Sequence, residues 1–292
     1  MPARSNLPDL GRLTSQAERA VRYARTEARV LARRRSSALP PQTLVVATPH
    51  KVGSTWMVKL IRSLHLHRSP IVPKRFRYRG FNSLVDLAAP GVDTFLAEGR
   101  TSRLYKSHAQ PPTWAVPDSV RFLTMVRDPR DALLSSAHYL ANMADEFGEW
   151  HELVPLSTVE RAHVLLDKAF FDLELYEAWT AYAHAVLVRY EDLLESAERE
   201  LQRVVDHCEL GAEVDAAAVH AAVEANSFAR LSGGRQQGDE EASSFYRSGT
   251  AGGWRDTFTP ELAQHFIEAA DGRWQKLLLD LGYESVDDWP AR

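Results

Sequence analysis

Short apolar runs alternate along the chain with longer segments of helical periodicity. Each run is about four to seven residues long and ends in polar or turn-forming residues, which is typical of strands buried on both faces of a sheet. The strand-like runs are residues 43–48, 103–106, 120–126 and 185–188.

Amphipathic segments follow these runs, with apolar residues at steps of three and four that predict helices packed by one face. They are residues 55–66, 130–141, 159–183, 193–208, 215–224, 260–270 and 272–281. Because strands alternate with helices, we expect an α/β fold: a three-layer α/β/α domain around a central, mostly parallel sheet of about five strands. Residues 71–99 and 232–253 show no clear period and predict long loops.

The first forty residues differ from the rest of the chain. They hold nine arginines and three acidic residues, and small apolar residues recur at helical spacing from Leu13 to Leu31. We therefore expect a basic helical arm over residues 1–40 and a single domain over residues 41–292. Such an arm either lies on the chain's own acidic body or docks on a partner chain or an anionic surface.

Composition narrows the class of protein. With 292 residues, of which 45% are hydrophobic and 25% charged, the chain is neither disordered, fibrous nor membrane-spanning by composition. Its apolar runs are far shorter than the roughly 20 residues that span a bilayer. The single cysteine, Cys208, allows no internal disulfide, so we expect a cytoplasmic protein. The residues after the basic arm carry a net negative charge, and the arm has no recognised nucleic-acid-binding motif, so we expect no nucleic-acid binding.

The first strand runs into a loop suited to an anion. Lys51, Gly53, Ser54 and Thr55 lie between this strand and a predicted helix that includes Trp56. A helix N-terminus offers unpaired N–H groups and partial positive charge, glycine allows close backbone approach, and the side chains add donors. The lysine precedes the glycine, unlike the loop of nucleotide triphosphatases, where it follows the glycines. We therefore expect a P-loop-like fold whose phosphate loop differs from that of the nucleotide triphosphatases.

Further polar motifs follow the other strands. Lys106-Ser107-His108 ends the second strand and Arg127-Asp128-Pro129-Arg130-Asp131 ends the third, so both are expected at the edge of the sheet where parallel folds bind ligands. Beyond them lie Ser135, Tyr190-Glu191-Asp192-Leu193, Asn226-Ser227-Phe228, Arg247-Ser248-Gly249 and Gly252-Gly253-Trp254.

In this order the motifs resemble those of the cytosolic sulfotransferases that use 3′-phosphoadenosine 5′-phosphosulfate (PAPS). The resemblance covers roughly residues 43–258 and rests on four patterns. These are x-P-x-K-x-G-[ST]-T-W, lysine-any-histidine, R-[DN]-P-[RK]-D with serine eight residues after the arginine, and R-x-G-x-x-G-x-W. Each is weak alone, but four in sequence order are specific.

The resemblance implies catalytic roles for Lys51, Lys106 and His108. By this resemblance, Lys51 would contact the bridging oxygen and the leaving phosphate, while Lys106 and His108 would face the sulfuryl group and the acceptor. The remaining residues would bind the donor. Gly53, Ser54 and Thr55 would hold the 5′-phosphate, Trp56 would stack on adenine, Tyr190, Asn226 and Phe228 would frame the nucleoside, and Arg127, Ser135, Arg247, Ser248 and Gly249 would form the 3′-phosphate region.

The chemistry of sulfuryl transfer agrees with these roles. Charge spreads over equatorial oxygens while nucleophile and leaving group lie in line, so positioning and cationic stabilisation dominate, and we expect no metal. A hydroxyl or amine acceptor loses a proton as it attacks, and a histidine is suited to accept it near neutral pH. His108, two residues after Lys106, is the predicted general base, with His50 and His138 as nearby competitors.

Two other functions stay open. One is a small-molecule kinase that uses ATP, against which the position of the lysine and the lack of an evident magnesium-binding aspartate argue. The other is a non-catalytic nucleotide-binding module that holds a partner through the basic arm; the presence of both Lys51 and His108 favours an enzyme.

The chain departs from the family at several positions. Val52 stands where serine is frequent, Asn226 where threonine is common, and Ser248 where animal enzymes have lysine, so the affinity for the donor is expected to be lower. Residues 255–264 do not preserve the family's short dimer motif, and Thr259-Pro260 predicts a helix start instead. A homo-oligomer is therefore possible, but its state is open.

The acceptor is expected to be a small molecule that binds among the irregular segments. Residues 74–79 interleave cations with aromatic residues, which favours an anionic or phenolic acceptor if this segment lines the entrance. Residues 232–248, rich in glycine and serine, are predicted to close over the bound donor.

Overall fold

Four parallel strands form the sheet in the part of the chain that the computed structural model describes, namely residues 24, 28–32, 39–77, 82–168 and 173–283. Their spatial order is β2-β1-β3-β4. The strands are β1 (Thr43–Ala47), β2 (Arg103–Ser107), β3 (Val120–Val126) and β4 (Ala185–Arg189). The predicted α/β class and all four strand positions are confirmed.

The described residues form four strands, close to the expected number of about five. Beside the edge strand β2, the chain makes only isolated bridges, from Arg68 to Arg103 and from Leu84 to Ser107. Two prolines, Pro70 and Pro73, lie between the bridging positions. Because proline lacks the N–H that a sheet ladder needs, pairing stops after single bridges.

Both faces of the sheet are covered, which explains why the strands are continuously apolar. Leu44 and Val46 of β1 face one hydrophobic cluster, and Val45 and Ala47 face a second one on the opposite side. All four side chains are fully buried. Alternate residues of a strand point to opposite faces, so a strand between two helical layers must be apolar throughout.

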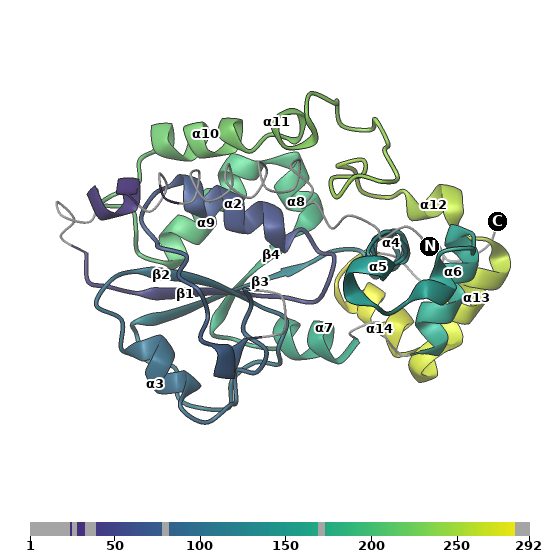
Figure 1. Ribbon diagram of the computed structural model, residues 1–292, viewed down its shortest axis with the longest axis horizontal. Coiled ribbons are helices and arrows are strands. Elements are labelled where there is room, and N and C mark those ends of the chain that lie inside the picture. The colour runs from purple at the N-terminus through teal and green to yellow at the C-terminus, as the bar shows by residue number, and fades with distance from the viewer. Residues whose placement is uncertain (1–23, 25–27, 33–38, 78–81, 169–172, 284–292) are drawn as a thin grey trace, which may run out of the picture.

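The layer on the face of Leu44 and Val46 consists of helices that follow β1 and β4 (Figure 1). Met57, Leu60 and Ile61 form the buried stripe of the first of these helices. The layer contains α2 (Ser54–Ser63), α8 (Tyr190–Glu195), α9 (Ala197–His207), α10 (Ala216–Ala225) and the neighbouring α11 (Phe228–Ser232).

The opposite face is covered by fewer elements (Figure 1). Trp179 is buried there, its ring packs on Phe122 of β3, and its indole N–H donates to the carbonyl of Ala109 over 2.8 Å. The elements on this side are η1 (Lys74–Phe76), α3 (Val92–Ala97) and α7 (Leu173–Thr180).

A third group of helices lies beyond the carboxyl ends of the strands, at the right of Figure 1. Its main helices begin where the sequence provides caps: Asp128 and Pro129 at α4, a capping box of Ser157 and Glu160 at α6, and Thr259 at α13. The group contains α4 (Pro129–Asn142), α5 (Ala144–Phe147), η2 (His151–Leu153), α6 (Thr158–Asp167), α12 (Trp254–Thr257), α13 (Pro260–Glu268), η3 (Ala269–Gly272) and α14 (Arg273–Asp280).

Two of the predicted helices are each divided in the structure. The segment 159–183 gives α6 and α7, because α6 packs on α4 and α13 whereas α7 packs on β3 and α14, and one straight helix cannot follow both directions. Residues 169–172 between them lie outside the described chain. The segment 193–208 is interrupted at Ser196, whose φ of −149° and ψ of 82° separate α8 from α9.

Most of the basic arm lies outside the described residues, so its predicted extent stays a prediction. Residues 28–32 are helical, as expected. The predicted apolar stripe ends at Leu31, but in the structure Leu31 is 42% exposed and the neighbouring Val30 is fully buried instead, so the prediction is wrong at this end. Among the residues described, no helix is both long and apolar enough to span a membrane.

Replacing Trp179 tests the smaller core. Trp179→Ala removes a buried aromatic ring and leaves the Ala109 carbonyl without its donor, so it is expected to lower the free energy of unfolding by about 3–5 kcal/mol. Urea denaturation measures the change. Ile71→Ala, at a side chain that is 71% exposed, is the control and should stay within about 0.5 kcal/mol of the parent. Equal effects of the two substitutions would contradict the packing described.

Candidate functional site

The loop between β1 and α2 has the backbone geometry of an anion site. Gly53 is the N-cap of α2 with φ of 90°, a left-handed conformation that favours glycine, and no side chain caps this helix end. A Cβ on Gly53 would lie 2.7 Å from the ring of Tyr190. Ser54 and Thr55 form the first turn of α2. The helix N-terminus is thus left to a ligand with negative charge.

Two lysines converge on this loop. Lys51 belongs to it, and Lys106, at the end of β2, donates from Nζ to Thr55 Oγ1 over 3.4 Å. Burial above all, together with the positive charges of Lys106, Arg127 and Arg247, lowers the pKa of Lys51 from 10.5 to about 7. Burial also lowers the pKa of Lys106 to about 8. An anion bound between these ammonium groups would reverse both shifts.

His108 is held in one orientation by two contacts. Its Nδ1 lies 2.7 Å from the carbonyl oxygen of Thr48, and because a carbonyl only accepts, Nδ1 carries the hydrogen and Nε2 keeps its lone pair. The ring of His50 stacks on it with centroids 4.1 Å apart. Burial lowers the pKa of His108 well below 6.5, and the charges of His50 and Lys106 act in the same direction. His108 is thus neutral at pH 7 and able to accept a proton through Nε2.

Arg127 enters the site from the end of β3. It lies over the ring of Tyr190, 4.5 Å from the centroid, and donates to the carbonyl of Thr250 over 3.0 Å. Its Nε is buried and has no hydrogen-bond partner within the described structure. A buried donor without a partner is costly, so this atom indicates a place for a ligand oxygen.

The other charged residues of the motif 127–131 form hydrogen bonds and ion pairs within the protein. Arg130 is fully buried, donates to both carboxylate oxygens of Asp128, and lies 3.5 Å from the centroid of Trp254. Asp131 accepts from the backbone N–H groups of Gly252 and Trp254. These contacts tie the C-terminal glycine segment to the start of α4.

The segment after α11 carries Arg247, Ser248 and Gly249. Arg247 forms an ion pair with Glu240 at 2.7 Å and lies 3.4 Å from Nε2 of His138. Gly249 has φ of 66°, and a Cβ there would lie 2.3 Å from the ring of Phe228. Ser248 Oγ shares a hydrogen bond with Thr250 Oγ1. In this structure a carboxylate thus pairs with the arginine that the sequence assigns to a phosphate.

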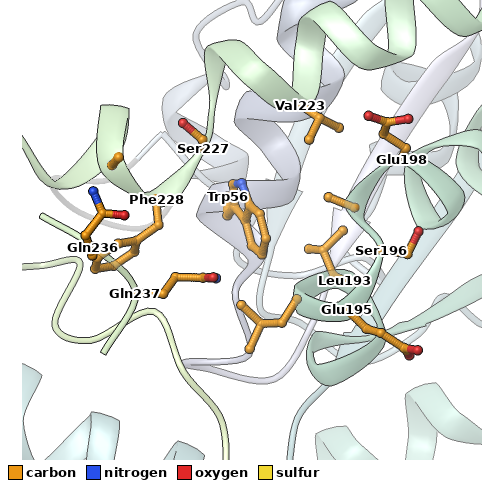
Figure 2. A pocket seen from close by; sticks show the side chains of 13 residues that line it. Trp56, Leu193, Glu195, Ser196, Glu198, Val223, Ser227, Phe228, Gln236 and Gln237 are labelled. Carbon is orange, nitrogen blue, oxygen red and sulfur yellow. The ribbon is translucent and has the colours of Figure 1, made fainter. Parts of the chain in front are cut away.

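A pocket of about 580 Å³ lies beside this segment. Figure 2 shows Trp56 in its middle, with Phe228 and Gln237 on one side and Leu193 and Val223 on the other. The pocket is walled by aromatic and aliphatic side chains with a few amide, hydroxyl and carboxylate groups. Such a mixture suits a planar, partly polar ring system.

Asn226 and Ser135 are both predicted to bind the sulfuryl donor. Asn226 makes hydrogen bonds to other protein groups, and Ser135 lies on α4. The carbonyl of Asn226 accepts from Trp56 Nε1 over 2.9 Å, and its side-chain amide donates to Ser63 and to the carbonyl of Ala222. Asn226 therefore orients the indole ring of Trp56 through this hydrogen bond. Ser135 is partly buried on α4, one turn before Tyr139.

Sequence reasoning did not find the two rings beside Lys51. The Nζ of Lys51 lies 3.8 Å from the ring centroid of Tyr139 and 4.9 Å from that of Phe245. A signal for Tyr139 exists, because it follows Ser135 by four residues and shares its helix face. Phe245 belongs to a segment without periodicity, so no local pattern identifies it.

Comparison with known proteins places the chain in a family. A model of the sulfotransferase domain matches residues 41–278. The chain belongs to the sulfotransferase domain family. Cytosolic sulfotransferase 12 of Arabidopsis thaliana is 25% identical over 80% of this chain and 77% of its own length, and sulfotransferase 1A1 of Bos taurus is 24% identical over 75% and 79%. The predicted resemblance to cytosolic-type, PAPS-dependent sulfotransferases is confirmed at the level of the family.

Solved structures agree on the fold of this sulfotransferase. A retinol dehydratase crystallised with retinol and PAP aligns with a TM-score of 0.54 at 18% identity, covering 92% of this chain and 88% of that one. A mouse sulfotransferase crystallised with PAP aligns with a TM-score of 0.53 at 14% identity, covering 81% and 88%. The sheet and its flanking helices are therefore those of known sulfotransferase structures.

A pair of glycine variants tests the contact between Gly249 and Phe228. Gly249→Ala would displace the Phe228 ring from the pocket and is expected to weaken binding of 3′-phosphoadenosine 5′-phosphate (PAP) more than about tenfold, measured by calorimetry. Gly238→Ala is the matched control, since Gly238 also has positive φ but has open space where the Cβ would lie. Equal losses in both variants would show that backbone strain, and not the ring, sets the affinity.

Proposed function

We propose that this sulfotransferase transfers the sulfuryl group of PAPS to a hydroxyl or amine of a small-molecule acceptor, with His108 as general base and Lys51 stabilising the leaving phosphate. The observation that carries the proposal is a concentration of positive charge. The charges of Lys106, Arg127 and Arg247, from three separate segments, all bear on Lys51 at the N-terminus of α2, beside a neutral His108. Such a cluster is more stable with anions between its members.

The residues present fit the two ends of the donor. The free N-terminus of α2 and Lys51 suit the 5′-phosphosulfate, while Arg247 and the unpartnered Nε of Arg127 suit the 3′-phosphate. The pocket around Trp56 and Phe228 suits adenine. Support also comes from the two structural neighbours that bind PAP, and the cytosolic sulfotransferase among the relatives supports a cytoplasmic location.

The donor supplies a sulfuryl group on a good leaving group, a phosphate. As the S–O bond to the leaving phosphate breaks and a bond to the acceptor oxygen or nitrogen forms, negative charge accumulates on that phosphate. Lys51 and Lys106 are placed to stabilise it. The proton lost by the acceptor goes to Nε2 of His108, whose Nδ1 hydrogen bond to Thr48 fixes the tautomer.

Substitution of His108 tests the assignment of the base. His108→Ala is expected to lower kcat at least about 100-fold, since general base catalysis contributes roughly that much or more, while PAP binding changes little. Turnover of PAPS with phenolic and amine acceptors and calorimetry with PAP measure the two effects. His184→Ala, at an exposed histidine before β4, is the control. A His108→Ala enzyme that keeps most of its turnover would exclude His108 as the base.

Proton uptake tests the lysine cluster. In the free protein the pKa of Lys51 is about 7 and that of Lys106 about 8, so at pH 8 Lys51 is mostly neutral and Lys106 about half protonated. A bound phosphate raises both pKa values, so PAP binding takes up protons, roughly one per molecule at pH 8, and the affinity falls as the pH rises above 7.

Calorimetry of PAP binding in buffers of different ionisation enthalpy measures that uptake. Lys51→Met removes the titrating amine and is expected to abolish most of it. ATP with Mg²⁺ serves as the comparison nucleotide, because a kinase would prefer it. Proton release, or tighter binding of ATP than of PAP, would contradict the proposed function.

A further inference from the structure

Lys51 does not extend freely into the donor site. Its ammonium group lies against two aromatic faces, Tyr139 from α4 at 3.8 Å and Phe245 from the segment after α11 at 4.9 Å, both distances taken to the ring centroid. The two rings contact each other edge to face, with centroids 6.1 Å apart. Two rings that also support each other form a clamp around a cation.

The chain around Phe245 is built to present this ring. Arg235 Nη2 donates to Ser244 Oγ over 2.9 Å and to the carbonyl of Tyr246 over 2.5 Å, so one guanidinium holds the residues on both sides of Phe245. Arg235 Nη1 donates to the carbonyl of Arg247 over 2.7 Å. Phe245 itself is 53% exposed, so burial of the ring alone does not explain its position.

A second anchor fixes this segment against α4. Asn142 at the end of α4 donates from Nδ2 to the carbonyl of Ala242 over 2.7 Å, three residues after Tyr139 on the same helix. The anchor brings the segment onto the helix that carries the other ring. Phe245 and Arg247, two residues apart on this segment, therefore reach the two ends of the donor site from one anchored stretch of chain.

We propose that Tyr139 and Phe245 are positioning residues that hold the ammonium of Lys51 at the donor site and couple its position to the segment that carries the 3′-phosphate arginine. Arg235 holds the backbone at Arg247 and on both sides of Phe245. A phosphate bound to Arg247 would therefore change the position in which Phe245 holds Lys51. The role in transfer rests on the proposed function, whereas the clamp itself is a property of the free protein.

Acylation of lysines in the free protein tests the clamp without any need for activity. A water-soluble acylating reagent at pH 8, followed by peptide mass spectrometry, reports the reactivity of each amine. Lys51 is already mostly neutral at pH 8, so its reactivity is limited by access. Phe245→Leu uncovers the amine and is expected to raise its reactivity about fivefold. Phe245→Tyr keeps the face and should restore the low reactivity of the parent.

The neighbouring residue offers a matched control. Tyr246 lies over a different lysine, with Lys59 Nζ 4.8 Å from its ring centroid. Tyr246→Leu is expected to raise the labelling of Lys59 and to leave that of Lys51 unchanged. Unchanged labelling of Lys51 in Phe245→Leu, or an equal rise in Tyr246→Leu, would overturn the clamp.

Kinetics separate positioning from a structural role of the segment. If Phe245 acts through Lys51, Phe245→Leu lowers kcat on the order of tenfold with little change in the KM for PAPS, and Phe245→Tyr restores kcat. A merely structural defect would displace Arg247 and raise KM instead, which contradicts the proposal. Protection of Lys51 by PAP in the parent is the separate test of donor binding: its absence would refute the proposed function while the free-protein labelling still decides the clamp.

Discussion

Repulsion between like charges at the carboxyl ends of the strands is the constraint on which the site depends. Lys51, Lys106, Arg127 and Arg247 come from four separate segments, and burial together with repulsion from the other three charges lowers the pKa of Lys51 to about 7. The fold bears this cost because hydrophobic clusters on both faces of the sheet fix the strand ends that carry Lys106 and Arg127. The same repulsion makes the site favourable for a ligand with several negative charges.

In the free protein, contacts with carboxylates and aromatic rings partly compensate the positive charges of the site. Arg247 pairs with Glu240, Arg127 lies over the ring of Tyr190 near Asp131, and Lys51 lies on Tyr139 and Phe245. Each substitute is weaker or less complete than a phosphate: the Nε of Arg127 keeps no partner within the described structure. Under the proposed function, a bound donor is expected to replace these contacts, so that part of its binding energy is used to position Lys51.

His108, as the proposed general base, meets a different requirement, because a general base must be unprotonated before it acts. Burial and the nearby charges lower its pKa, whereas the hydrogen bond to the Thr48 carbonyl raises it but fixes the hydrogen on Nδ1, which leaves the lone pair on Nε2. His50, stacked on it, belongs to the same loop as Lys51. The short loop after β1 thus contacts the proposed base and carries the lysine that we propose stabilises the leaving phosphate, so one loop bears on the position of both groups.

Local order in the sequence was enough to predict the strands, the turn after β1 and the family, because a doubly covered strand must be apolar throughout and a phosphate loop requires glycine and donors in a short stretch. It was not enough to predict that the edge of β2 makes only single bridges, that the helix after residue 193 breaks at Ser196, or that Asn226 acts through its backbone carbonyl on Trp56. The clamp on Lys51 shows the physical reason. Tyr139 and Phe245 are about a hundred residues apart and meet only because Asn142 and Arg235 anchor an aperiodic segment onto α4, and contacts between such distant residues depend on packing that no local pattern encodes.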